Sequence, residues 1–229
     1  MELRSFTGRD DLASALARFV ADALEHRIRR DGKAALAVSG GRTPTRFFEA
    51  LAGERLPWSD VVVTLVDERW VDEDSPRSNA ALVRRHLLHG PAGAAEFVPL
   101  WRPVPTPEDG LAAVSAAIAD LPHPFAAVVL GMGDDGHTAS FFPGGDRLAE
   151  ALDPAGTAPV LPMRAPGAGE PRITLTLPLL LAADRVAIHV EGDGKMAVLD
   201  AARAGDDVAE MPVRAVLRAA HPPAVFWCG

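Results

Sequence analysis

Short apolar runs rich in β-branched residues alternate along this chain with alanine- and leucine-rich stretches of helical period, and this alternation limits the possible folds more than any other feature. Repeated strand–helix units of this kind build a mostly parallel sheet with helices packed on it. Strands are expected at Ala34–Val38, Val61–Val66, Phe125–Leu130, Arg172–Leu177, Arg185–Val190 and Ala224–Trp227, with a shorter one at Phe97–Leu100. The sequence therefore predicts an α/β fold.

Helices are expected between these strands. The first should run from an N-cap at Asp10 or Asp11 to about Arg30, because apolar residues recur there on one face. The others are expected at Pro44–Ala52, Pro76–Leu88, Pro107–Ala119, Gly194–Arg203 and Pro212–Ala219. Three of these follow a hydroxyl residue, Thr43, Ser75 or Thr106, whose oxygen can cap a free N–H while the following proline has none to satisfy.

Two segments rich in proline, glycine and alanine, Pro99–Pro107 and Asp153–Pro171, are expected to be long loops. The second is either a mobile lid or a passive crossing of the surface. The chain contains no internal repeat and no low-complexity linker, so one domain over residues 1–229 is predicted.

Charge and cysteine content restrict the partners. A formal net charge of -8 disfavours nucleic acid and anionic membrane, although a small anion still responds to the few cations in its own pocket. The single cysteine, Cys228, fits a reducing compartment, and the charged start and the lack of a long apolar run indicate neither a secretion signal nor a membrane span. A soluble cytoplasmic protein is expected, monomeric or at most a weak dimer.

The segment Ser39-Gly40-Gly41-Arg42-Thr43-Pro44 links the first expected strand to a helix. Paired glycines let backbone approach a ligand closely, and a helix start presents free N–H groups and the positive end of its dipole. This segment is therefore a candidate phosphate cradle, and the alternative is a tight turn without a ligand. It is not a P-loop, because no Gly-Lys-Ser/Thr follows.

Polar residues also follow the second expected strand. Asp67, Glu68 and Arg69 stand at its carboxyl end, where ligands bind in open α/β sheets, and Ser78-Asn79 lies shortly after them. The two acids and the arginine can orient sugar hydroxyls or hold a cationic partner, and the polar groups at Ser78-Asn79 can help to bind an anion. The alternative is a solvated turn that carries an ion pair.

The segment from Gly131 to Gly144, Gly-Met-Gly-Asp-Asp-Gly-His-Thr-Ala-Ser-Phe-Phe-Pro-Gly, follows a buried strand and carries most of the functional argument. Glycine N–H groups such as that of Gly131 can face a ligand. His137 is suited to general acid–base catalysis, and Asp135 can fix its tautomer or share its proton.

A different reading of this segment is a dinucleotide fingerprint, because Gly131, Gly133 and Gly136 have the spacing G-x-G-x-x-G. Asp134 and Asp135 would then lie against a pyrophosphate, and no long helix follows, so this reading is disfavoured. His86 and His89 lack a third metal ligand, so a core or surface role is favoured over a zinc site. Two cations, Arg172 and Lys195, lie beside strands and can pair with a phosphate.

The Ser39–Pro44, Asp67–Val71, Gly131–Gly144 and Arg172–Pro178 segments, with Ser78-Asn79 and the Gly192–Lys195 turn, resemble the 6-phosphogluconolactonase family, and they occur in the order found in that family. The resemblance implies a doubly wound, mostly parallel sheet flanked by helices, Rossmann-like, as in the glucosamine-6-phosphate deaminase superfamily. It also implies hydrolysis of 6-phospho-D-glucono-1,5-lactone without cofactor or metal, in the oxidative pentose phosphate pathway. A phosphorylated sugar lactone is then the expected small-molecule partner.

The site implied by these segments has His137, Asp67 and Asp135 as catalytic residues. Substrate binding is assigned to Ser39, Gly40, Gly41, Thr43, Arg69, Ser78, Asn79, Gly131, Arg172 and Lys195. The competing function is that of the sister glucosamine-6-phosphate deaminase or a related sugar-phosphate isomerase. That deaminase has an aromatic residue where Arg69 stands and Asn-Glu-Pro where this chain has Ser140 to Pro143, so the lactonase is favoured.

Overall fold

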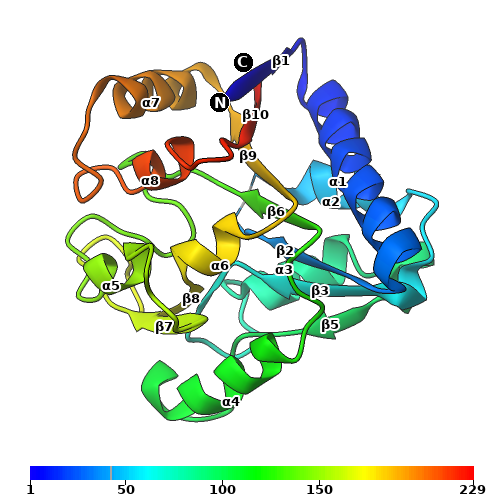
Figure 1. The fold of residues 1–229 in the computed structure, drawn as a ribbon, viewed down its shortest axis with the longest axis horizontal. Helices are drawn as coiled ribbons and strands as arrows, with labels where there is room; N and C mark the ends of the chain where they lie inside the picture. Colours follow the sequence, from blue (N-terminus) through cyan, green and yellow to red (C-terminus); the bar gives the residue numbers. More distant parts are fainter. Residues whose placement is uncertain (42) are drawn as a thin grey trace.

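The computed structural model describes residues 1–41 and 43–229. Its main feature is a parallel sheet of seven strands in the order β1-β10-β9-β6-β2-β3-β5 (Figure 1). Their bounds are β1 Glu2–Phe6, β2 Ala34–Val38, β3 Val61–Leu65, β5 Glu96–Val98, β6 Ala127–Leu130, β9 Arg185–Glu191 and β10 Ala224–Cys228. Strand order reverses around β2 and β6, and ligands bind beyond the strand ends at such a point.

A small antiparallel sheet stands beside the first one, with β8 in its centre. It consists of β4 Asp67–Arg69, β7 Val160–Met163 and β8 Arg172–Leu175. Strand β4 begins two residues after β3 ends, so the small sheet extends from the carboxyl edge of the large one. Residues from β4 and β8 are thereby brought to the same edge as the loops after β2, β6 and β9.

Helices lie on both sides of the large sheet (Figure 1). On one side α1 packs against α2 and contacts β1, β2, β9 and β10. Helix α2 in turn packs against α3. On the other side α8 contacts both α6 and α7. The helices are α1 Arg9–Asp31, α2 Thr45–Ala52, α3 Asn79–His86, α4 Pro107–Ala119, α5 Leu148–Leu152, α6 Leu177–Leu181, α7 Asp193–Ala204 and α8 Val213–Leu217, with 3-10 turns η1 Trp58–Asp60 and η2 Gly90–Ala94. This arrangement confirms the predicted doubly wound α/β fold.

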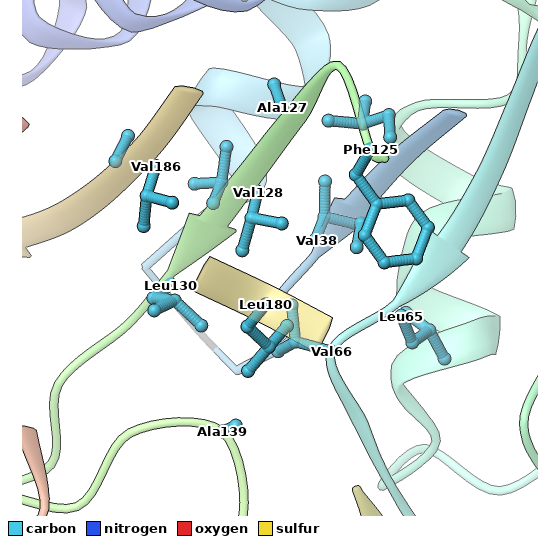
Figure 2. Close-up of a cluster of buried hydrophobic side chains, with 14 of the residues drawn as sticks. Val38, Leu65, Val66, Phe125, Ala127, Val128, Leu130, Ala139, Leu180 and Val186 are labelled. Atoms are coloured by element: carbon cyan, nitrogen blue, oxygen red, sulfur yellow. The ribbon is translucent and has the colours of Figure 1, made fainter. Parts of the chain in front are cut away.

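The central strands are apolar on both faces because helices cover both sides of the sheet. Every residue of β2 and β3 is buried, as expected for strands in the middle of a parallel sheet. Figure 2 shows side chains of β2, β3, β6 and β9 converging with Leu180 of α6. Ala139, from the loop after β6, reaches the border of the same cluster, so the core directly supports that loop.

Helix α1 ends as its sequence predicts but starts earlier. Gly32 adopts the left-handed conformation with φ 82°, and its N–H donates to the Ile28 carbonyl at 2.8 Å. At the other end, Gly8 is the N-cap, so the prediction of Asp10 or Asp11 was wrong. Both aspartates instead lie in the first turn, where their charge complements the helix dipole.

The hydroxyl–proline prediction holds at one of three positions. Thr106 caps α4 by accepting a hydrogen bond from the Asp109 amide at 3.2 Å. Helix α2 begins after Pro44 without a side-chain cap, and α3 begins at Asn79 with Ser78 as its cap, so Ser75 was the wrong choice.

Five short strands and helices were not predicted: β1, β4, β7, α5 and α6. Strand β7 also lies inside the expected loop Asp153–Pro171, and β8 ends at Leu175 because α6 begins at Leu177. The Pro99–Pro107 segment is free of regular structure until α4 starts at Pro107. None of the described helices is both long enough and apolar enough to span a bilayer.

Candidate active site

A cavity of about 280 Å³ opens at the carboxyl edge of the large sheet, where the loops after β2, β6 and β9 meet β4 and β8. It lies at the small end of the range for ligand pockets, which suits a sugar phosphate better than a dinucleotide. Its polar lining comes from Ser39, Gly40, Gly41, Thr43, Asp67, Arg69, Asn79, Gly131, Gly133, His137, Thr138, Arg172, His189, Glu191 and Lys195.

The glycine turn after β2 forms one wall of this cavity. Ser39 accepts a hydrogen bond from the Gly131 amide at 3.0 Å, which ties the turn to the loop after β6. A Cβ on Gly40 would overlap the side-chain amide of Asn79, and Gly41 has φ 93°, so both positions require glycine. Arg42, in the same motif, lies outside the described residues. The turn leads directly into the N-terminus of α2, a favourable place for an anion.

His137 and Asp135 form a hydrogen-bonded pair in the loop after β6. His137 Nδ1 lies 2.6 Å from Asp135 Oδ1, and the same oxygen accepts a hydrogen bond from the His137 amide at 3.0 Å. Burial acts to raise the pKa of Asp135, but the amide hydrogen bond and the imidazole outweigh it, so this pKa is lowered. A carboxylate at Nδ1 leaves Nε2 as the nitrogen that can take a proton from a reactant.

Two arginines lie side by side in the small sheet. The antiparallel register of β4 and β8 places Arg69 opposite Arg172. The Arg172 side chain lies over the ring of Phe142, which in turn packs on the His137 imidazole with centroids 4.3 Å apart. Burial, aided by the charge of Arg69, lowers the pKa of Arg172 although Asp67 opposes this. The two guanidinium groups carry like charges, and their buried Nε atoms have no hydrogen-bond partner among the described residues. Such a pair attracts an anionic or oxygen-rich ligand.

Asp67 is held at the base of the cavity by a residue from a distant segment. Ser140 Oγ donates to Asp67 Oδ2 at 2.6 Å, and Arg172 Nη1 lies 3.8 Å from the same oxygen. The Asp67 backbone oxygen also accepts a hydrogen bond from Asn79 Nδ2 at 3.0 Å. Asp67 is therefore oriented on several sides, as expected of a group that positions a substrate hydroxyl.

Glu68 lies behind this wall and organises it. Its fully buried carboxylate accepts hydrogen bonds from the Arg69, Asn79 and Ala80 amides at 2.8 Å and from Ser78 Oγ at 3.1 Å. It thereby fixes the start of α3 against β4. Ser78, predicted to bind substrate, does not line the cavity, because its hydroxyl is engaged with Glu68 and with the α3 cap.

The protonation of Glu68 should make stability depend on pH. Burial raises its pKa from 4.5 to about 7 against the three amide hydrogen bonds. The folded protein then holds this proton more tightly than the unfolded chain, so the stabilisation is fullest below pH 4.5 and is lost as the pH rises through 7. We expect the free energy of unfolding of wild type, relative to Glu68→Gln, to fall by about 2 to 3 kcal/mol between pH 5 and pH 8. Urea denaturation at both pH values measures this difference, and an equal difference at the two would contradict it.

Lys195 enters the cavity from the first turn of α7. Its Nζ lies 2.6 Å from Asp134 Oδ1, but Asp134 is 92% exposed, so a ligand can compete for the ammonium group. Lys195 and the glycine turn after β2 line the same cavity. Together with the N-termini of α2 and α7, the ammonium group contributes positive potential to the cavity.

Two titratable lining residues, His189 and Glu191, were not predicted. His189 Nε2 lies 3.0 Å from Glu191 Oε1, and Arg9 Nε lies 3.2 Å from Glu191 Oε2. The signal that would have indicated them was present: both stand at the carboxyl end of a buried strand, just before the Gly192–Lys195 turn. The cavity thus holds two histidine–carboxylate pairs.

Of the thirteen predicted site residues, the cavity lining includes all but Ser78 and Asp135, and Asp135 touches it through His137. The described residues contain no group of three or more histidine, cysteine, aspartate or glutamate side chains placed to hold a metal ion.

Comparison with known proteins matches this geometry. Residues 7–227 match the family model described as glucosamine-6-phosphate isomerases/6-phosphogluconolactonase. The chain is 52% identical over 224 residues to the 6-phosphogluconolactonase of Mesorhizobium japonicum, covering 97% of this chain and 93% of the relative. It is 46% identical over 215 residues to that of Pseudomonas aeruginosa, covering 94% and 90%.

Solved structures of similar proteins have the same fold. A 6-phosphogluconolactonase from Shewanella baltica superposes with a TM-score of 0.97 at 39% identity and covers 100% of this chain and 98% of its own. A monomeric glucosamine-6-phosphate deaminase superposes with a TM-score of 0.80 at 16% identity, over 100% and 97%, which shows a shared fold alone.

Proposed function

The chain belongs to the glucosamine-6-phosphate isomerase/6-phosphogluconolactonase family, and from this membership we propose that it hydrolyses 6-phospho-D-glucono-1,5-lactone to 6-phosphogluconate. The observation that carries the proposal is the His137–Asp135 pair, joined at 2.6 Å, on the same cavity as the glycine turn after β2 and Lys195. The histidine–aspartate pair can act on an ester, while the glycine turn and Lys195 hold a phosphate. Relatives with 38 to 52% identity that bear the name 6-phosphogluconolactonase support this assignment.

In the proposed reaction His137 acts as general base and then as general acid. Nε2 takes a proton from the attacking water, the water oxygen adds to the lactone carbonyl, and the same proton passes to the ring oxygen as the ester bond breaks. Asp135 stabilises the imidazolium that forms in between. Gluconolactones already open in water, so positioning and acid–base assistance are sufficient and no covalent intermediate is needed.

The substrate phosphate is proposed to bind at the Gly40–Thr43 turn, with Lys195 and Arg172 supplying charge. Asp67 and Asn79 are then placed to orient sugar hydroxyls. The amides of Gly131, Gly133 and Gly136 already donate to Ser39 Oγ, the His137 carbonyl and the Gly133 carbonyl. We therefore propose that Arg69 Nε, which has no hydrogen-bond partner among the described residues, donates to the lactone carbonyl oxygen in place of these amides.

Proton release from freshly generated 6-phosphogluconolactone tests the function. A rate well above spontaneous hydrolysis supports the lactonase assignment. No acceleration, together with ammonia release from glucosamine 6-phosphate, would identify a deaminase instead.

Substitution of Lys195 tests the phosphate end. Because a hydrogen bond to a charged group contributes about 1.5 to 3 kcal/mol, Lys195→Ala should raise KM for the phosphorylated lactone at least about tenfold and leave kcat less affected. The control is Lys33→Ala, which removes the other lysine of the chain from an exposed position. Equal KM values for the two variants would contradict a phosphate contact by Lys195.

A further inference from the structure

The second histidine–carboxylate pair of the cavity has no part in the reaction described above. His189 is 4% exposed, yet it lines the cavity. Its Nε2 is engaged with Glu191, while its Nδ1 is buried and has no partner among residues 1–41 and 43–229. A buried polar atom without a partner is unfavourable unless a ligand or water completes it.

The pair lies at the anion-binding part of the cavity. His189 packs edge-on against Phe47 in the first turn of α2, with centroids 6.3 Å apart. Lys195, in the first turn of α7, follows it closely along the chain. His189 therefore lies beside the first turn of α2 and lines the same cavity as Lys195 of α7, and phosphate oxygens are favoured at such helix starts.

A carboxylate at this place would repel a phosphate unless its charge were balanced. Both oxygens of Glu191 are occupied, one by His189 and the other by Arg9 at the exposed start of α1. A carboxylate beside Nε2 leaves Nδ1 as the ring nitrogen that can donate to an anion when the ring carries both protons. Arg9 in turn balances the charge of Glu191.

We propose that His189 is a ligand of the substrate's phosphoryl group through Nδ1, positioned by the Glu191–Arg9 pair, and that it contributes to selectivity for phosphorylated over unphosphorylated lactones. The inference rests on the proposed function for the identity of the phosphate ester. It adds a residue on the β9 side of the cavity to the cations already assigned.

Two variants separate the nitrogens of His189. His189→Asn keeps an amide near the position of Nδ1, whereas His189→Gln keeps one near Nε2. We expect Gln to raise KM for 6-phosphogluconolactone about ten- to a hundredfold and Asn to raise it less, with little change for glucono-1,5-lactone in either. His86→Gln is the matched control, because His86 forms a similar pair with Glu49, at 3.1 Å, outside the cavity. Unchanged KM in His189→Gln, or equal losses on both lactones, would overturn the proposal.

A binding measurement tests this proposal independently of the lactonase assignment. In wild type, inorganic phosphate should shift the imidazole nitrogen resonances of His189, while gluconate should not. Phosphate affinity should fall in His189→Gln, whether or not the lactone proves to be the substrate. Phosphate binding with no change in those resonances and no loss in the variant would refute the contact.

Discussion

His137→Ala is expected to lower kcat for lactone hydrolysis by about 10² to 10⁴ and to leave KM for the phosphorylated lactone nearly unchanged. The imidazole is the group proposed to move the proton, whereas the phosphate is held elsewhere in the cavity. Its side chain is 30% exposed, so its removal should not disrupt the core. Proton-release assays, corrected for spontaneous hydrolysis, measure both kcat and KM.

The matched control for this variant is His221→Ala, which removes an exposed histidine that does not line the cavity. It should retain wild-type kinetics. Near-normal turnover by His137→Ala would keep the lactonase function but remove His137 from the chemistry.

Gly133→Ala should also lower kcat for lactone hydrolysis, although it removes no functional group. A Cβ at this position would overlap His137 Nδ1 and lie 2.6 Å from Asp135 Oδ1, so the histidine–aspartate pair must shift. Because a displacement of about 1 Å at a reacting group can cost about 10²-fold in rate, we expect kcat to fall by at least that factor. The phosphate contacts should keep KM within a few-fold of wild type.

Gly8→Ala provides the comparison, because its added Cβ meets nothing within 4 Å. It should have wild-type activity. The Gly133→Ala protein should also show altered His137 imidazole resonances. If those resonances and kcat were both unchanged, the close packing of Gly133 against the pair would not control catalysis.

The elements that sequence predicted best are those whose burial is complete. Strands β2, β3 and β6 are buried throughout and, apart from Thr64, apolar, because both faces are covered, so their runs stand out. Strand β1 was missed because Glu2 to Phe6 is a half-exposed edge strand with charged residues. Its one neighbour in the sheet, β10, comes from the far end of the chain, and no local sequence pattern predicts that pairing.

The site was predictable where one short segment carries its own geometry, as in the loop with Asp135 and His137. It was not predictable where the geometry depends on strand register. The opposition of Arg69 and Arg172 follows from the pairing of β4 with β8, and the hydrogen bond from Ser140 to Asp67 joins two segments far apart in sequence. The start of α3 was misplaced because Glu68, ten residues earlier, supplies part of the α3 cap.

The order of strands in the sheet also determines when the enzyme can become active during synthesis. The loop with His137 follows β6, which lies between β2 and β9, and β9 is translated later than that loop. A nascent chain that ends before β9 has the glycine turn and the His137–Asp135 pair but lacks a supporting strand for β6 and the part of the cavity that holds Lys195. Since contacts between distant segments form late in folding, hydrolytic activity should be among the last properties that the emerging chain acquires.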